Sequence, residues 1–278
     1  MAAERIHRVK SADGTEIAGR VQGEGPPLVF LPAGPGTSEA SWRHVVPHLA
    51  GSFACYMVDT RGRGLSAPSD DHRPERLCED VVAFVRSLGT PAGIVEWGSD
   101  LWGRVAVAAG DAVSGVAIYD TGVDAVMDPA IAPQFGEVIG GVAERAGQGK
   151  LEEAAEFLIE RSHLLYSEED YYAEAAPRFW REAVPNIPVF VQELMLAGEA
   201  PAGATGDPET LARVQAPVLL MRGARSNEWF RKSIDYLAGH LPDAAVRDID
   251  AAHFGPYLAP EEVAREISGF FTAALPRA

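Results

Sequence analysis

The strongest constraint on the fold is a turn signal, Gly98 to Gly103, that lies between two apolar segments. Residues 93–95 before it read Gly-Ile-Val, and residues 104–108 after it read Arg-Val-Ala-Val-Ala. This order predicts a strand, a sharp turn and a helix. Such a turn projects the side chain at its tip, here Asp100, above the sheet and at the N-terminus of the helix. Because the helix dipole favours an anion there, the turn is a candidate site for carboxylate chemistry.

Apolar runs and helical patterns alternate along most of the chain. Unbroken apolar runs are typical of strands buried on both faces of a parallel sheet, and they occur at residues 27–31, 53–58, 93–95, 113–119 and 216–221. Segments with helical spacing are residues 42–49, 79–88 and 229–241. The remaining elements are a hairpin over 5–22 with Asp13-Gly14 at its turn, a strand at 245–249 and a helix at 261–274. This alternation predicts the α/β class, with a mostly parallel sheet and crossover helices.

The pattern changes between residues 123 and 210. This stretch is helix-like, acidic and aromatic, and it contains no run typical of a buried strand. Residues 198–208 are rich in Gly, Ala and Pro, which predicts a loop that leads back to the sheet. We therefore expect a core domain made of residues 1–122 and 211–278, with residues 123–210 inserted into it as a helical cap.

Composition narrows the class of protein. The chain has 278 residues, of which 47% are hydrophobic, so it can bury one large core. Its net charge of −16 repels phosphate backbones and anionic membrane surfaces, so we expect neither nucleic acid nor membrane as a partner. The 2 cysteines are too few for a disulfide framework. The N-terminal residues lack the apolar region that is typical of a signal peptide. No apolar stretch approaches the roughly 18 residues that span a bilayer. We expect a cytoplasmic protein that binds a small molecule, with a homodimer left open.

Four segments match one known family in order. Residues 31–36 read Leu-Pro-Ala-Gly-Pro-Gly, and residues 59–66 read Asp-Thr-Arg-Gly-Arg-Gly-Leu-Ser. The turn at Gly98 is the third segment, and residues 252–257, Ala-His-Phe-Gly-Pro-Tyr, are the fourth. Together they resemble the α/β-hydrolase family, in which the nucleophile stands on a strand–turn–helix elbow. The resemblance implies the α/β-hydrolase fold, a mostly parallel central sheet flanked by helices with an inserted helical cap. In that family the second segment is structural.

The register of the elbow decides the chemistry. The family places a Gly two residues before the nucleophile, so Gly98 assigns that position to Asp100. A carboxylate is ionised at neutral pH and needs no base in order to attack. Ser99 is the rival nucleophile, but it would put Trp97 where the family needs Gly. Asp is also a preferred N-cap residue, which is the structural alternative for Asp100.

His253 is the candidate general base, because it follows the predicted last strand and the chain order matches nucleophile, acid and histidine. The other histidines show no metal-ligand spacing on one element, so we expect no metal and no cofactor. The usual acid position of the family holds Ser226. Asp120 occupies the alternative acid position, which members resembling haloalkane dehalogenases use, and Glu228 is the weaker candidate. A turn-capping Asp is the structural alternative for Asp120.

The resemblance also implies two backbone amides, of Gly34 and Leu101, that stabilise an oxyanion. Two departures from the family lie close to them. Pro32-Ala33 replaces His-Gly before the first amide, and Trp102 stands where close packing of helix and strand normally requires Gly. We expect Trp102 either to widen the elbow or to place its indole in the substrate pocket.

Aromatic residues gather in the predicted cap. Epoxide hydrolases of similar layout use cap tyrosines to donate O–H bonds to the epoxide oxygen. The candidates for the substrate pocket are therefore Tyr166, Tyr171, Tyr172 and Trp180, with core packing as the alternative for each and for their neighbour Phe179. Haloalkane dehalogenases instead hold halide with a Trp directly after the nucleophile, and that residue here is Leu101.

These residues predict a hydrolase that is most like an epoxide hydrolase acting on a small to medium organic substrate. Asp100 would form an ester with the substrate, and water activated by His253 would cleave that ester. The departures from the family leave open a lyase, cyclase or isomerase in which the same two residues act as acid and base. A Ser99-dependent esterase and an inactive binding protein are the further alternatives.

Overall fold

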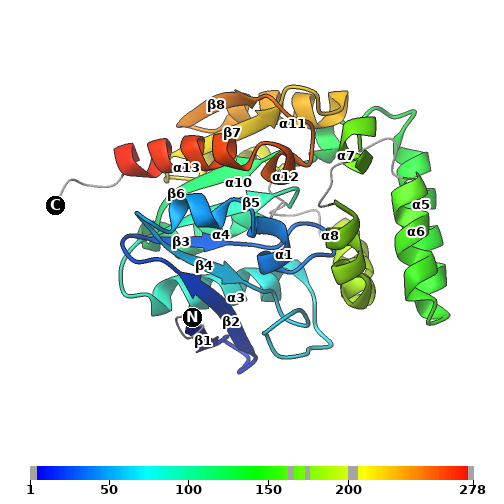
Figure 1. Cartoon of the computed structure of the whole chain (residues 1–278), viewed down its shortest axis with the longest axis horizontal. Coiled ribbons are helices and arrows are strands. Elements are labelled where there is room, and N and C mark those ends of the chain that lie inside the picture. The colour runs from blue at the N-terminus through cyan, green and yellow to red at the C-terminus, as the bar shows by residue number, and fades with distance from the viewer. Residues whose placement is uncertain (1–4, 100, 162–165, 173–175, 200–205, 275–278) are drawn as a thin grey trace.

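The computed structural model describes residues 5–99, 101–161, 166–172, 176–199 and 206–274. Within them lies an eight-stranded sheet in the order β1-β2-β4-β3-β5-β6-β7-β8 (Figure 1). The strands are β1 (Arg5–Lys10), β2 (Glu16–Gln22), β3 (Pro27–Phe30), β4 (Ala54–Val58), β5 (Ala92–Trp97), β6 (Val113–Tyr119), β7 (Val218–Gly223) and β8 (Ala244–Ile249). β2 pairs antiparallel with both β1 and β4, and every other pair is parallel. The predicted α/β class with a mostly parallel sheet is confirmed.

Helices cover both faces of the sheet, and each face has its own apolar cluster. The first face packs against α3 (Pro74–Ser87), α4 (Leu101–Ala109), α10 (Pro208–Ala212) and α11 (Glu228–His240). The second packs against α1 (Ser38–Trp42), α2 (Val46–Leu49) and α13 (Pro260–Ala274), with α12 (Gly255–Leu258) just before α13. All residues of the central strand β5 are buried, as expected for a parallel strand covered on both sides.

Two helices differ from the sequence prediction. In place of the single helix expected over 42–49, α1 ends at Trp42 and α2 begins only at Val46, with a proline in its first turn. Proline has no backbone N–H to donate to the preceding turn, so it begins a new helix here. α3 begins at Pro74, ahead of the predicted start at residue 79, because proline also presets the backbone angle of a first helical turn.

The described part of residues 123–210 contains helices and no strand. Its helices are η2 (Asp124–Val126), α5 (Ala132–Gly147), α6 (Leu151–Arg161), α7 (Glu168–Tyr172), α8 (Ala176–Ala183), η4 (Val184–Asn186), α9 (Ile187–Glu199) and the start of α10. Figure 1 shows α5 to α8 together at one side of the molecule. Apolar residues of α5, α6, α8 and α9 belong to the same cluster as the second face of the sheet. Among the described residues, no helix has both the length and the apolar character needed to cross a membrane.

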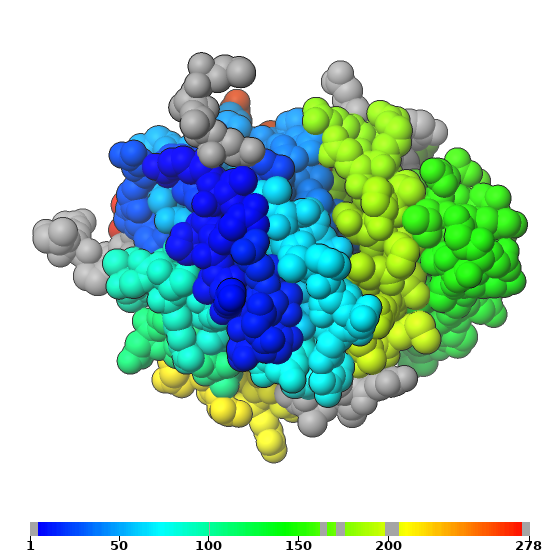
Figure 2. Space-filling model, turned by 90° about the horizontal axis from the view of Figure 1, so that it is seen from below, coloured from blue at the N-terminus to red at the C-terminus, as the bar shows by residue number. Residues whose placement is uncertain are grey.

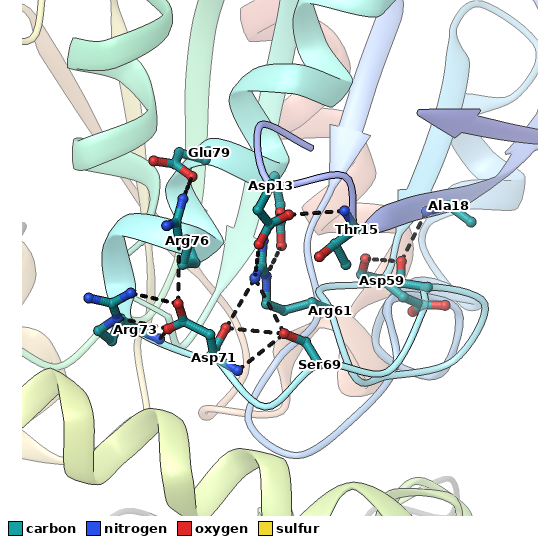
Figure 3. A network of polar contacts seen from close by, with 12 residues as sticks. Asp13, Thr15, Ala18, Asp59, Arg61, Ser69, Asp71, Arg73, Arg76 and Glu79 are labelled. Atoms are coloured by element: carbon teal, nitrogen blue, oxygen red, sulfur yellow. Dashed lines mark hydrogen bonds and ion pairs between the residues drawn. The ribbon is translucent and has the colours of Figure 1, made fainter. Parts of the chain in front are cut away.

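The segment after β4, which matches the family's structural run, holds a buried ion-pair network around Arg61 (Figure 3). The guanidinium is fully buried and donates to both carboxylate oxygens of Asp80 in α3, at 2.8 and 2.7 Å. It also donates to Asp13 in the β1–β2 turn at 2.8 Å and to the carbonyl of Asp71 at 3.1 Å. The hydrogen bond from Arg61 holds the pKa of Asp13 well below its usual range. One side chain thus joins the hairpin, α3 and the loop before it.

Replacement of Arg61 by Leu is expected to lower the free energy of unfolding by about 3–5 kcal/mol, because it leaves the buried carboxylate of Asp80 without its cation. Urea denaturation measures this loss. The matched control is Arg73→Leu, since Arg73 pairs with Asp71 at the surface and its side chain is 57% exposed. The control should change the midpoint little. Equal midpoint shifts in the two variants would contradict the assigned role of Arg61.

Candidate active site

The predicted strand–turn–helix is present after β5. The strand ends at Trp97, and α4 begins at Leu101. Gly98 between them has a φ of +66°, a left-handed conformation that glycine adopts without a steric penalty. Its N–H donates to the carbonyl of Asp120 at 2.8 Å and to that of Tyr119 at 3.1 Å. The turn that follows β5 is therefore bonded to the end of β6.

The two rival nucleophiles follow Gly98. Asp100, the predicted nucleophile, lies outside the described residues. The hydroxyl oxygen of Ser99 accepts from the N–H of Leu101 at 3.4 Å, and its carbonyl accepts from the Thr121 hydroxyl at 2.7 Å. Within the described ranges, no hydrogen bond joins Ser99 to His253. Ser99 is thus bonded to the start of α4 rather than to the candidate base.

The structure brings Asp120 and His253 together. Oδ2 of Asp120 lies 3.4 Å from Nδ1 of His253, and the Asp120 side chain is fully buried. An ionised carboxylate can only accept, so Nδ1 carries the proton and Nε2 of the neutral ring is left as an acceptor. A Cβ placed on Gly98 would lie 3.5 Å from Nε2 and from Cε1 of His253. The basic edge of the imidazole therefore faces the turn after β5.

The end of β7 supplies two more donors to Asp120. The N–H of Gly223 donates to Oδ1 at 3.1 Å, and the hydroxyl of Ser226 donates to Oδ2. Ser226 stands at the usual acid position of the family, and here its hydroxyl binds Asp120, the candidate acid that follows β6. Glu228, the weaker candidate acid, is 72% exposed and pairs with Lys232 at 2.9 Å. Its carboxylate faces solvent on α11, and the structure does not bring it to the histidine.

Aromatic rings enclose His253, whose side chain is only 9% exposed. Phe230 of α11 stacks on the imidazole, with ring centroids 4.1 Å apart and an interplanar angle of 2°. Trp97 and Tyr166 each lie with their ring centroids 5.7 Å from it. The imidazole therefore sits in a mostly apolar setting, in which its contact with Asp120 is little screened by water.

The inserted helices contribute part of this enclosure. Tyr166 packs against His253 and Phe254, and Trp180 lies one ring further out, 5.7 Å from Tyr166. Two of the predicted pocket residues, Tyr171 and Tyr172, end α7, and their side chains lie outside what the structure describes. The structure therefore places one candidate tyrosine, Tyr166, beside the candidate base.

The structure does not bring Trp102, a predicted pocket residue, to the candidate base. Its side chain is fully buried in the cluster of the first sheet face, with Leu31, Ile94 and Ile118. Trp102 is the second residue of α4, and its own N–H donates to Oε2 of Glu96 at 3.3 Å. The rotation of the helix turns the indole toward the sheet and away from the face that carries the aromatic enclosure.

Sequence reasoning missed Trp97, which is the centre of that enclosure. Its ring contacts Trp42, Phe179, His253, Phe254 and Tyr257, at centroid distances of 5.1 to 6.4 Å. The period of 2 along β5 carries the signal, because it puts Trp97 and Val95 on the second sheet face and Ile94 on the first. The sequence prediction considered Trp97 only as an obstacle to a Ser99 nucleophile.

The predicted oxyanion amide of Gly34 lies in a loop that Arg63 holds. Gly34 has a φ of +44°, and among the described residues its N–H donates no hydrogen bond. Arg63 donates to the carbonyls of Gly34 and Gly36 through Nη1. Through Nη2 it pairs with Glu193 of α9, whose burial raises the pKa of that carboxyl. The loop after β3 is thereby tied to the inserted helices. In Figure 2, the cyan surface of the segment that leads into α3 lies against the yellow-green surface of α8 and α9.

Comparisons with solved structures agree on the architecture. An alpha/beta hydrolase from Sphaerobacter thermophilus is 23% identical, with a TM-score of 0.77 over 95% of this chain and 100% of the other. An esterase from Rhodococcus is 21% identical, with a TM-score of 0.75 over 97% and 99% of the two chains. A haloalkane dehalogenase variant from Bradyrhizobium elkanii is 23% identical, with a TM-score of 0.72 over 98% of each. At these identities the likeness shows the α/β-hydrolase fold.

Comparisons of sequence add a family and a partial relative. Epoxide hydrolase B from Mycobacterium tuberculosis is 33% identical over 105 residues, which are 34% of this chain and 30% of that protein. The chain thus spans about a third of the length of that relative. The model of the alpha/beta hydrolase family matches residues 28–266, which include the turn at Gly98, Asp120 and His253. The chain belongs to the alpha/beta hydrolase family.

Proposed function

We propose that this chain is a hydrolase in which Asp100 is the nucleophile, His253 the general base and Asp120 the carboxylate that orients the base. The observation that carries the proposal is the Asp120–His253 contact of 3.4 Å, with Nε2 of the imidazole turned toward Gly98. Asp100 directly precedes the first residue of the nine-residue helix α4. The helix dipole favours a carboxylate at that position, and a carboxylate needs no base in order to attack.

The first step forms an ester on the enzyme. A carboxylate oxygen of Asp100 attacks a ring carbon of an epoxide, the bond from that carbon to the ring oxygen breaks, and the ring oxygen takes a proton. Tyr166 is the proposed proton donor, because its ring lies 5.7 Å from that of His253 and it stands in the inserted segment, two residues before α7. A phenol is a suitable donor, since it is protonated at neutral pH.

The second step releases the product. Nε2 of His253 takes a proton from water, and the water oxygen attacks the carbonyl carbon of the ester. The resulting oxyanion accepts hydrogen bonds from the amides of Gly34 and Leu101. The intermediate collapses to a diol and the carboxylic acid of Asp100, as His253 gives its proton to the departing alkoxide. The carboxylic acid of Asp100 then loses its proton, which restores the phenol of Tyr166 that gave up a proton in the first step, so both groups return to their starting states. One oxygen of the carboxylate then comes from water.

Two features favour an epoxide over a haloalkane as substrate. The halide-binding position directly after the nucleophile is Leu101, and the indole of Trp102 is buried on the opposite sheet face. The partial relative with 33% identity is an epoxide hydrolase. The inserted helices act in this proposal as the cap. Because the rings around His253 are aromatic, the cap and core together suit an uncharged organic substrate.

A single turnover of a small aryl epoxide in ¹⁸O-water is expected to put ¹⁸O into the peptide that contains Asp100, as read by mass spectrometry. In His253→Gln the same peptide should instead carry the mass of the substrate, because the ester forms and water is not activated. Turnover without label in that peptide would exclude the covalent step. A product isomeric with the substrate would favour the lyase or isomerase, and rapid labelling of Ser99 by a fluorophosphonate would favour the esterase.

Asp120→Asn is expected to lower kcat by roughly 10³–10⁴-fold, as loss of the orienting carboxylate does in serine proteases. Asn tolerates the positive φ of +34° at this position, so the backbone is kept. The matched control is Glu228→Gln, which changes the exposed candidate acid and should leave kcat unchanged.

The double variant Asp120→Ser, Ser226→Asp exchanges the two residues of the Ser226–Asp120 hydrogen bond, so that the carboxylate comes from position 226. Because Ser226 and His253 both bind Oδ2 of Asp120, this pair should recover part of the lost kcat. A loss of activity in Glu228→Gln together with an active Asp120→Asn would assign the acid to Glu228 instead.

A further inference from the structure

Helix α7 of the proposed cap presents two consecutive acidic residues, Glu169 and Asp170, to the core. Asp170 is 2% exposed, and its Oδ1 accepts from the N–H of Phe254 at 2.7 Å. Its Oδ2 accepts from the N–H and the hydroxyl of Ser167, at 2.8 and 3.0 Å. Both oxygens of a buried carboxylate are thus satisfied, one of them by the residue that follows His253.

Glu169 binds the loop after β7. Arg225 donates to both of its carboxylate oxygens, through Nε at 2.7 Å and through Nη2 at 2.8 Å. Arg225 also pairs with the carboxylate of Asp250 and donates to the carbonyl of Asp250 at 2.9 Å. The hydrogen bonds from Arg225 lower the pKa of Glu169. Arg225 therefore joins three segments, namely α7 and the loops after β7 and β8, and its bond to Glu169 is bidentate.

The two contacts meet at the candidate catalytic pair. Arg225 precedes Ser226 in the chain, and Phe254 follows His253. Ser226 and His253 both contact Oδ2 of Asp120. The acidic pair of α7 therefore binds the chain neighbours of both side chains that meet on this oxygen. The ring of Tyr166, two residues before α7, packs on the same imidazole.

We propose that Asp170 is a positioning residue, supported by Glu169, through which the cap sets the geometry of the Asp120–His253 contact. This inference rests on the proposed function in one respect, namely that the Asp120–His253 contact takes part in catalysis. Asp170 holds the backbone at residue 254, so its loss frees the histidine loop beside Nδ1. A displacement of the imidazole by a fraction of an ångström lengthens a contact that is already 3.4 Å. Misplacement on that scale lowers kcat far more than it changes substrate binding.

The charged groups near this contact come from the end of β6, from α7 and from the loops after β7 and β8, whereas β5 and α11 contribute the rings of Trp97 and Phe230. Asp120 contacts the imidazole directly, and from α7 Asp170 binds the N–H of Phe254 while Glu169 binds Arg225. Arg225 separates the α7 acids from Asp250 after β8. All of α7 could instead serve only to hold the cap on the core. A suitable control for that role is another ion pair between cap and core, Arg43 with Glu182 of α8, which among the described residues binds no residue next to Asp120 or His253.

The test compares Asp170→Ala, Asp170→Asn and Glu182→Ala in the full chain. In Asp170→Ala we expect kcat for an aryl epoxide to fall roughly 10- to 100-fold with little change in KM. We also expect a changed ¹H chemical shift of the His253 Nδ1–H, which reports its hydrogen bond to Asp120 and is assigned by comparison with His253→Gln. Asp170→Asn keeps an acceptor oxygen for the N–H of Phe254 and should restore both values. Glu182→Ala should leave the Nδ1–H signal unchanged.

Equal losses of kcat in Asp170→Ala and Glu182→Ala, with an unmoved Nδ1–H signal in both, would overturn the proposal in favour of simple attachment of the cap. If Asp170→Ala does not fold, Glu169→Gln replaces it, because it weakens the fork at a partly exposed site and should shift the same signal less. The chemical shift of the His253 Nδ1–H is measured without substrate, so it tests the positioning role of Asp170 independently of any activity. If the wild-type chain hydrolyses no epoxide, the proposed function is disproved. If the Nδ1–H signal of His253 nevertheless shifts in Asp170→Ala, the positioning role of Asp170 still stands.

Discussion

The candidate site depends on the hydrogen bonds that the fully buried carboxylate of Asp120 accepts. A charge without solvent is tolerated only where donors replace the lost water. Here the donors are the N–H of Gly223, the hydroxyl of Ser226 and Nδ1 of His253, while the carbonyl of Asp120 accepts from the N–H of Gly98. Segments that are far apart in the chain therefore meet at one residue. Its φ of +34° is unfavourable for most side chains, and the surrounding bonds hold it there.

This arrangement explains how the chain can lack an acid at the usual position. A serine after β7 gives no charge to a histidine, but its hydroxyl can help to satisfy a carboxylate supplied by β6. In the proposed triad the acid stands after β6, one strand earlier than usual, and the serine at the usual acid position donates a hydrogen bond to it. The same reasoning makes Glu228 unsuitable, because a carboxylate that is 72% exposed is already satisfied by water and Lys232.

The sequence was sufficient where pattern and register decide the outcome. Apolar runs located the buried strands, and chain order brought Asp120 and His253 to one edge of the sheet, since parallel strands end at the same side. The sequence was insufficient where the rotation of a helix or the packing of side chains determines the position of a residue. The direction of the Trp102 indole depends on the turn of α4 over the sheet, and the division at residue 46 depends on one proline. Contacts such as that of Asp170 with Phe254 join residues with no shared pattern.

The inserted helices are not equivalent in what they impose on the core. α5 and α6 pack on each other and on α9, so changes in their side chains alter mainly the outer cap. α7 is bonded to the backbone beside His253 and to the arginine beside Ser226, and Tyr166 precedes it. A substitution in this segment made to admit another substrate would also disturb the loops that carry the base and the serine. If the proposed function holds, substrate range and catalytic geometry are therefore coupled through α7, while α5 and α6 leave them separable.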